Sequence, residues 1–313
     1  MPESFRDLSL FVAAYEERSF TAAAQRENAT QPGVSQHIRK LEDRLGVRLF
    51  ARGTGAVVPT PAGDALYARA TNILRAREEA ERAVRAFRQS PGGGPALEGE
   101  VHVGLMPTMT RCALAPALNR FIRAQPNVVV RITEAYSAML TPMTIAGDLD
   151  FSVVPAFGGT AGLRVRAFLR TPEVLVSAAA SPLPHMGAVR LAGLGPLRLA
   201  LPGPRNTRRG TIETYLASNG VAVERITELD AMLGTLDLVA TAGWMTVLPA
   251  IMMANETTRR HFTVSRLADP PLSLELVLIQ PLRRTLTEPA SAFLAVLEEE
   301  TARLNTAWDP PTP

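Results

Sequence analysis

The sequence predicts an N-terminal winged helix-turn-helix, which is mostly α-helical, followed by a linker helix and a two-lobed α/β domain. Three observations predict this fold class. Two short helical patterns are separated by residues of low helix propensity at 28–30. A long helical pattern then stops at the Pro- and Gly-rich stretch 90–95. Beyond that stretch, patterns typical of strands and of helices alternate, as they do in α/β domains.

The first part of the chain has the apolar periodicity of three short helices. Residues 5–17 form one helical stripe, and a second pattern starts at Phe20. The third helix begins at Thr30, a favourable N-cap, with Pro32 in its first turn, and it ends at Gly46. Its apolar side chains recur every three or four residues and would pack on the first two helices: Val34, Ile38, Leu41 and Leu45.

The opposite face of the third helix carries amide, hydroxyl and basic side chains, which contact base edges or phosphates in DNA-binding proteins. On an isolated amphipathic helix, such a face is more often simply solvated. The following residues favour DNA, because short strands at 47–50 and 57–58 flank a glycine turn and would form a wing. The candidate DNA-binding residues are Thr30, Gln31, Pro32, Ser35, Gln36, Arg39, Lys40, Arg48 and Arg52.

These residues resemble a known family. The runs SFTAAA, QPGVSQHIRKLEDRLGVRLFAR and VVPTPAG are similar to the DNA-binding signature of the LysR-type transcriptional regulators, and the similarity covers residues 5 to about 65. Two positions depart from the pattern. Glu27 stands where the family usually has an aliphatic residue, and Gln36 stands where arginine is frequent. The resemblance implies a sequence-specific DNA-binding regulator that responds to a small-molecule inducer, with RNA polymerase as a possible partner.

The long helical pattern predicts a helix from 61 to about 89 with one apolar stripe, which includes Ile73, Leu74 and Val84. A lone helix cannot bury such a stripe, so the same helix of a second copy is the expected partner. Two-fold symmetry would let a homodimer or homotetramer read an inverted-repeat operator in double-stranded DNA. The stretch 90–98 is the expected hinge.

The C-terminal part reads as βαβαβ units. Strands are expected at 101–105, 128–132 and 150–154, with helices at 110–124 and 138–146 between them. Later expected elements are strands at 173–176, 197–201, 245–248 and 274–279 and helices at 211–218 and 289–304. Two such lobes joined by crossing strands resemble periplasmic binding proteins, as does the effector domain of the LysR family; GDLDFSVVP (147–155) and GWMTVLP (243–249) are similar to its recurring segments.

The expected domains follow from these elements. They are a DNA-binding domain at 1–60, a linker helix at 61–89, a hinge at 90–98, effector lobe I at 99–170 and 274–304, and effector lobe II at 171–273.

In open α/β sheets, ligands bind where strands end, against helix N-termini that favour anions. This rule points to the turns after four expected strands and, with the uncharged lining, to an organic or aromatic carboxylate. Thr108 and Ser137 could instead be ordinary helix caps, Trp244 could belong to the core, and Arg205, Arg208 and Arg209 are expected in a solvated loop. The candidate effector-binding residues are Thr108, Ser137, Pro155, Pro202, Arg205 and Trp244.

Charge and cysteine content narrow the class of protein. Residues 1–90 contain 14 Arg and Lys against 11 Asp and Glu, whereas the remainder is balanced, so the net charge of +3 lies in the part assigned to DNA. The single cysteine, Cys112, excludes an intramolecular disulfide framework and fits a cytoplasmic protein; a role as a redox sensor stays open. The N-terminus lacks a secretory pattern, and the uncharged run 238–255 is interrupted by Gly243 and Pro249, so no membrane contact is expected.

Two other functions compete with a DNA-binding regulator. A cytoplasmic solute-binding protein without a DNA role would share the two lobes, but an exported one would need a signal that the sequence lacks. An enzyme is not expected, because the four histidines are scattered and no HExxH, GxSxG or P-loop motif is present. No catalytic residue, metal site or cofactor is predicted. The effector, the target genes, the sign of regulation and the choice between dimer and tetramer stay open.

Overall fold

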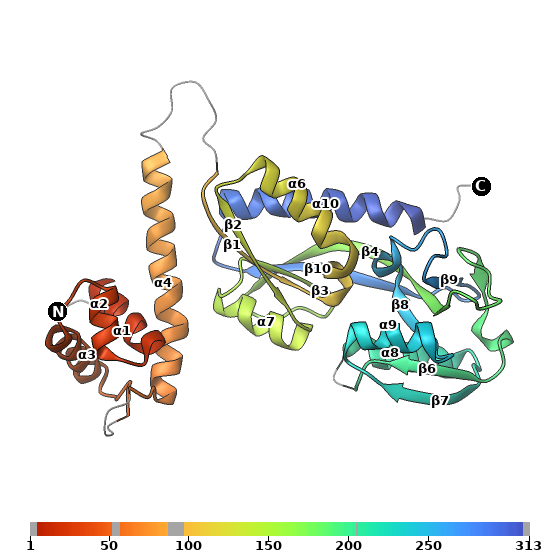
Figure 1. Cartoon of the computed structure of the whole chain (residues 1–313), viewed down its shortest axis with the longest axis horizontal. Helices are drawn as coiled ribbons and strands as arrows, with labels where there is room; N and C mark the ends of the chain where they lie inside the picture. The colour runs from red at the N-terminus through yellow and green to blue at the C-terminus, as the bar shows by residue number, and fades with distance from the viewer. Residues whose placement is uncertain (1–4, 52–56, 87–96, 205, 309–313) are drawn as a thin grey trace. The chain divides into compact units, whose positions relative to one another are not determined.

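The computed structural model describes residues 5–51, 57–86, 97–204 and 206–308 (Figure 1). The chain divides into two compact units. The first contains the residues up to 96 together with 146–148, and the second contains 97–145 and 149–313. Two of the predicted site residues, Arg52 and Arg205, lie outside the described residues. So do residues 87–89, the expected last residues of the linker helix.

The first unit is a helical head whose core lies where its helices meet. Phe11 and Val34 are fully buried and Ile38 nearly so, and the ring of Phe50 packs against that of Phe11 at a centroid distance of 5.6 Å. This core uses the apolar positions that the three-and-four spacing predicts. The helices of the described part are α1 (Phe5–Glu17), α2 (Phe20–Arg26), α3 (Gln31–Leu45) and α4 (Pro61–Ala86).

The linker helix α4 is attached to the head by aromatic and polar contacts at its N-terminal half. Tyr67 of α4 stacks on Tyr15 of α1 with ring centroids 3.9 Å apart. The Tyr15 hydroxyl donates to Asp64, and the Tyr67 hydroxyl donates to Glu16. Ala70 is fully buried in the head core, so part of the apolar stripe expected to face a second copy is used within the chain, whereas Ile73 is 43% exposed.

Glu27, which departs from the family pattern, has a charged partner instead of an apolar one. Its carboxylate lies 3.3 Å from the guanidinium of Arg6, and the same guanidinium donates to the Glu27 backbone carbonyl at 2.7 Å. The head therefore closes α1 onto the end of α2 with a surface ion pair at this position.

The second unit is built on one long mixed sheet. Three parallel strands, β2, β1 and β3, continue through antiparallel β10 and β4 to β9 and β5, and β8 pairs with β4. A second parallel pair, β6 and β7, is joined to β8 by a bridge between Leu199 and Met245. The strands are β1 (Gly99–Leu105), β2 (Val128–Glu134), β3 (Phe151–Pro155), β4 (Leu163–Ala178), β5 (Ala188–Val189), β6 (Leu197–Leu201), β7 (Val223–Glu228), β8 (Thr246–Pro249), β9 (Phe262–Leu267) and β10 (Ser273–Pro281).

Helices cover both faces of the lobe I sheet (Figure 1). On one face, α6 and α10 pack with Phe121 and Phe293 in an edge contact at 5.2 Å. On the other face, α7 buries Leu140. In lobe II, α8 and α9 accompany the β6 and β7 pair. The remaining helices of the described part are α5 (Pro107–Met109), η1 (Thr110–Leu114), α6 (Ala115–Ala124), α7 (Ser137–Ala146), η2 (Leu191–Gly193), α8 (Thr207–Ser218), α9 (Met232–Thr241), η3 (Ala250–Met253), α10 (Glu288–Asn305) and η4 (Thr306–Trp308).

The predicted fold class is confirmed: a helix-turn-helix head, a linker helix and two α/β lobes joined by the crossing strands β4 and β10. The strand expected at 173–176 is only the end of the much longer β4, and strands β7 and β9 and helix α9 were not predicted. The wing has a single antiparallel bridge, from Phe50 to Pro59, in its described part.

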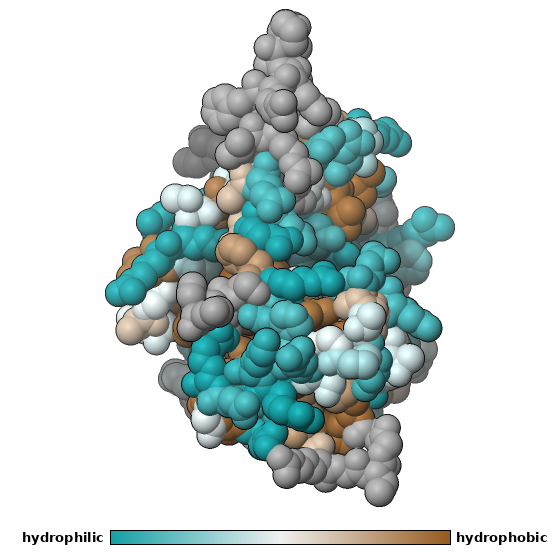
Figure 2. Space-filling model, turned by 90° about the vertical axis from the view of Figure 1, so that its left-hand side faces the viewer, coloured by the Kyte–Doolittle hydropathy of each residue, from teal (hydrophilic) through white to brown (hydrophobic). Residues whose placement is uncertain are grey.

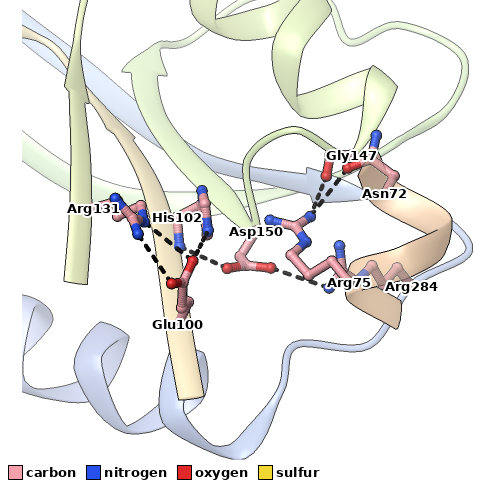
Figure 3. A network of polar contacts seen from close by, with 8 residues as sticks. All are labelled: Asn72, Arg75, Glu100, His102, Arg131, Gly147, Asp150 and Arg284. Carbon is pink, nitrogen blue, oxygen red and sulfur yellow. Dashed lines mark hydrogen bonds and ion pairs between the residues drawn. The ribbon is translucent and has the colours of Figure 1, made fainter. Parts of the chain in front are cut away.

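A network of polar contacts links the edge strand β2 to its neighbour β1 and to the start of β3 (Figure 3). Glu100 of β1 accepts two hydrogen bonds, of 3.0 and 3.1 Å, from Arg131 on β2, and a third contact of 3.1 Å joins it to His102. Asp150, which is buried, accepts from the His102 backbone amide at 2.8 Å and lies 3.4 Å from Arg284. These contacts fix the register of β1 between β2 and β3.

We expect Glu100 to stabilise lobe I at neutral pH and to lose this effect in acid. The hydrogen bonds from Arg131 lower the pKa of Glu100 from 4.5 to about 2, against the opposing effect of partial burial. Because the pKa of Glu100 is lower in the folded than in the unfolded protein, its carboxylate stabilises the fold fully above pH 4.5. This contribution is lost as the pH falls towards 2. Because the carboxyl is partly exposed, Glu100→Gln should cost at most about 1 kcal/mol.

Urea unfolding of the full chain at several pH values checks this prediction. The stability gap between the wild type and Glu100→Gln should narrow steadily below pH 4.5. Glu275→Gln, which changes an exposed carboxylate on β10, is the matched control. A gap that stays constant down to pH 3 would contradict the prediction.

Candidate functional site: a DNA-reading head and an interlobe cleft

The third helix begins and ends as its sequence dictates. The Thr30 hydroxyl accepts from the Gly33 backbone amide at 3.3 Å, Pro32 lies in the first turn, and Gly46 ends the helix in the left-handed region at φ 68°. These are the start and stop signals that satisfy the free backbone groups of a helix. The helix is thus held at both ends by local interactions, and one face packs on α1 and α2.

The polar face of α3 is turned to solvent. Thr30, Gln31, Pro32, Gln36, Arg39 and Lys40 are exposed, and Ser35 is half-buried. Among the described residues, neither Arg39 nor Lys40 has an ion-pair partner, so both charges are available to phosphates. Figure 2 turns the left-hand side of Figure 1 towards the viewer, and hydrophilic residues cover much of the surface drawn in colour there.

Arg48 lies in the wing and is exposed, but its charge is shared. Its guanidinium donates to Glu42 at 2.7 Å, and Glu42 is 7% exposed. The other carboxylate oxygen accepts from the backbone amides of Leu49 and Phe50 at 2.7 and 3.2 Å. Glu42 therefore ties the start of the wing to the recognition helix and sets where Arg48 can reach.

The second unit contains a narrow cleft between its lobes. Met106, Pro107 and Thr108 follow β1, Tyr136 follows β2, and Pro202 follows β6, so the cleft lies at the carboxyl ends of the strands. The polar side chains in the lining are Thr108, Tyr136, Asn206, Arg208, Thr235 and Thr246; methionines 106, 232 and 252 are prominent among the apolar ones. Its free volume of about 20 Å³ has room for about one water molecule in this arrangement of the lobes.

Polar contacts of Tyr136 and of Arg111 join the two lobes. The Tyr136 hydroxyl of lobe I donates to the Asp230 carbonyl of lobe II at 2.8 Å. On the other side, Arg111 donates to the Met252 carbonyl and lies 3.5 Å from Glu256.

Arg208 lies buried in the cleft wall. Its Nε and Nη2 make three hydrogen bonds of 2.8 to 3.0 Å to the Glu173 carboxylate, and Nη2 also donates to the Val247 carbonyl at 3.2 Å. Burial raises the pKa of Glu173, and the Arg208 charge acts against this shift. The expectation that Arg208 and Arg209 form a solvated loop is wrong: they are 6% and 8% exposed in the first turn of α8. Arg208 pairs with Glu173 of β4, and Arg209 pairs with Glu213 and Glu228.

The structure brings together only some of the predicted effector residues. Thr108 and Pro202 line the cleft. Ser137 begins α7, and Pro155 ends β3, paired with Leu276; neither belongs to this lining. Trp244 is 7% exposed in the lobe II core, with the Arg198 guanidinium 4.6 Å from its ring centroid.

Cys112 is buried beneath the cleft. Its thiol donates to the Met252 carbonyl at 3.1 Å, and Arg111 lies 3.7 Å from the sulfur. A buried thiol with a backbone acceptor has the surroundings of a structural cysteine. Among the described side chains, no group of three or more His, Cys, Asp or Glu could hold a metal ion.

Comparison with known proteins matches both units. Residues 5–64 match the family described as bacterial regulatory helix-turn-helix protein, lysR family, and residues 95–302 match the LysR substrate binding domain. The chain belongs to the LysR family. It is a LysR-type DNA-binding transcriptional regulator with a substrate-binding domain for a small-molecule effector, as the resemblance implied, and its relatives are regulators and not enzymes.

Similar full-length proteins extend this LysR assignment over the whole chain. The nitrogen assimilation regulatory protein nac of Escherichia coli K12 is 28% identical over 295 residues, which cover 94% of each chain. A full-length OxyR variant from Pseudomonas aeruginosa has a TM-score of 0.69 at 20% identity and covers 100% of both chains. Full-length CbnR in complex with its target DNA has a TM-score of 0.65 at 21% identity and covers 96% of this chain and 100% of that one.

Sequence reasoning missed several residues of this LysR cleft. Tyr136 lies in the turn after β2, which was expected to contact the ligand because it follows a strand. Ser137 was chosen from this turn instead of Tyr136. Asn206 caps α8, and a Pro-Gly turn followed by Asn is a recognisable helix start. The pairing of Arg208 with Glu173 has no local signal, because the two residues are 35 positions apart.

Proposed function

We propose that this LysR-type regulator reads an inverted-repeat operator with the exposed face of α3 and that a small molecule in the interlobe cleft controls it. The observation that supports the reading surface is the exposed row of Gln31, Gln36, Arg39 and Lys40 on a helix capped at both ends. The side-chain amides of Gln31 and Gln36 can read base edges, and the basic groups of Arg39 and Lys40 can bind phosphates. The protein acts in the cytoplasm, with RNA polymerase as a possible partner. Within the described residues, no helix combines the length and apolar character that a membrane span requires.

The proposed unit of recognition is a homodimer or a homotetramer. One α3 helix covers a single half-site, so two heads are needed for an inverted repeat. Ile73 of α4 is exposed although it lies on the apolar side of the helix, and packing against a second α4 would bury it. The full-length CbnR structure, a similar fold, was solved with its target DNA.

Control by an effector follows from the narrow cleft. A ligand can shift the equilibrium between an open and a closed arrangement of the lobes only if it binds the two arrangements with different affinity. Because the cleft has room for about one water molecule, any larger effector favours a more open arrangement. We infer that opening changes how the two lobes, and through the linker the two heads, are presented to DNA.

The recognition surface is tested by changing Arg39 or Gln31. Arg39→Ala removes an exposed charge without a described partner, so the fold should be unaffected while operator binding weakens about tenfold and its salt dependence falls. Gln31→Ala should relax base preference at one position of each half-site. Gel-shift titration with the DNA upstream of the protein's own coding region, at two salt concentrations, measures both effects.

Arg123→Ala is the matched control, because it removes an exposed charge in lobe I. Operator binding that is equally strong in the wild type and in both head variants, with the fold intact, would reject α3 as the reading helix.

A further inference from the structure

The described lining of the cleft contains one charged side chain, that of Arg208, and its charge is already balanced. Two of its nitrogens donate three hydrogen bonds to Glu173, and the side chains of the two residues are only 7% and 4% exposed. Such a planar, charge-assisted pair is strong when water is excluded. To a ligand in the cleft, the pair therefore presents almost no net charge.

Two backbone amides that could hold an anion beside Arg208 are also occupied. The turn after β6 leads into the N-terminus of α8, which is the usual place for a bound anion. In this protein, the Gly203 amide donates to the Asp230 carboxylate at 2.9 Å. The Arg208 amide donates to the Asn206 side chain at 3.1 Å. The side chains of Asp230 and Asn206 thus occupy two of the amides that could receive a ligand carboxylate.

The charges around Tyr136 on the other wall do not favour an anion either. Burial, together with the negative charges of Asp230 and Glu134, raises the pKa of the Tyr136 hydroxyl, and Arg208 opposes this shift. Asp230 is also the residue whose carbonyl accepts from Tyr136. The negative charges of Asp230 and Glu134 lie behind the lining and would repel a carboxylate bound beside Tyr136.

The rest of the lining suits an uncharged molecule. Met106, Met232 and Met252 provide flexible apolar surface that can adapt to a ligand. Thr108 and Thr246 provide hydroxyl groups that can donate to or accept from a neutral ligand. Burying an anion here without a new counter-charge would be unfavourable, and so would displacing Glu173 from its partner.

We propose that the cleft selects an uncharged, largely apolar small molecule, and that Glu173 and Asp230 act as built-in carboxylates that exclude anionic ligands. This inference rests on the proposed function only in taking the cleft as the effector site. An uncharged ligand is proposed here in place of the carboxylate expected from the strand-end turns. A carboxylate would need free turn amides and an unpaired basic side chain, and the groups described above are already paired.

The first test compares three probes that share one ring: benzamide, benzyl alcohol and benzoate. Ligand-observed NMR and calorimetry on the full-length wild type should show binding of the two neutral probes, with benzoate at least roughly tenfold weaker. Benzoate binding as tight as that of benzamide would overturn the proposal, and so would the absence of binding by all three probes.

The second test removes the built-in carboxylates one at a time. Glu173→Gln keeps the shape of the side chain but leaves the Arg208 charge unbalanced, so benzoate binding should strengthen roughly tenfold. The double variant Glu173→Gln, Arg208→Gln should lose this gain. Glu275→Gln, an exposed carboxylate-to-amide change, should leave the probe preference unchanged. Unchanged benzoate binding in a folded Glu173→Gln protein would overturn the proposal.

If Glu173→Gln does not fold, Asp230→Asn tests the same idea, because it weakens the carboxylate contact on the Gly203 amide. This variant should also gain affinity for benzoate, and no gain would overturn the proposal. A gel shift on the same preparations tests operator binding separately from ligand selectivity. Probe selectivity without operator binding would contradict the proposed function alone, whereas operator binding without probe selectivity would contradict this inference alone.

Discussion

Arg208→Met is expected to destabilise the second unit by about 3–5 kcal/mol at neutral pH, because it leaves the Glu173 carboxylate buried without its counter-charge. The loss should be smaller in acid. Burial raises the pKa of Glu173, and without the guanidinium that opposes this shift the folded pKa rises further. A raised folded pKa means that the variant loses stability as the pH rises through that value, so its gap to the wild type narrows as the pH falls.

Denaturant unfolding of the full chain, followed by near-ultraviolet circular dichroism at several pH values, measures this effect. The double variant Glu173→Met, Arg208→Met removes both charges together, and most of the lost stability should return. Arg190→Met is the matched control, since its side chain is 66% exposed and 3.9 Å from Asp269. A double variant as unstable as Arg208→Met alone would show that packing, and not the unpaired charge, sets the loss.

The helices of the head could be predicted from sequence because local signals set them, whereas the wing strands expected at 47–50 and 57–58 are reduced to one bridge in the described part of the wing. The N-cap at Thr30, the stop at Gly46 and the spacing of Val34, Ile38 and Leu41 each act within a few residues. The same holds for β1, β2 and β3 with their intervening helices, which alternate along the chain.

Strand β4 shows why the rest of the sheet could not be predicted. It runs from Leu163 to Ala178, but only 173–176 was expected. Its first half alternates exposed arginines with apolar residues, and Pro172 lies inside the strand, a residue that normally argues against a strand. Its first part pairs with β10 and its last part with β8 and β9, and pairing between such distant segments leaves no local pattern.

The candidate site divides in the same way. The proposed DNA-reading face lies on one helix, so helical spacing alone predicts which residues share it. The cleft instead collects side chains from several separate turns, and strand ends could suggest the turns but not the side chains that meet there. The decisive contact, from Arg208 to Glu173, changes a basic loop into a neutral wall and is set entirely by tertiary structure.

Glu42→Ala is expected to destabilise the head by about 2–4 kcal/mol, because it leaves the buried amides of Leu49 and Phe50 without an acceptor. The same change frees Arg48, whose contact with Glu42 is 2.7 Å long. Operator binding should weaken in spite of this freed positive charge, since the wing is no longer tied to α3. If Glu42 acted only through its charge, Glu42→Ala would instead strengthen operator binding, because removing an acidic group near DNA strengthens phosphate binding.

Calorimetric unfolding of the full chain and gel-shift titration, performed on the same preparation, distinguish these outcomes. Glu42→Gln should lie between the wild type and the alanine variant, because its amide oxygen can still accept from a backbone amide but carries no charge. Asp43→Ala removes the neighbouring exposed carboxylate and should leave the stability of the head nearly unchanged. Tighter operator binding by Glu42→Ala than by the wild type would show that Glu42 acts by charge and not by holding the wing.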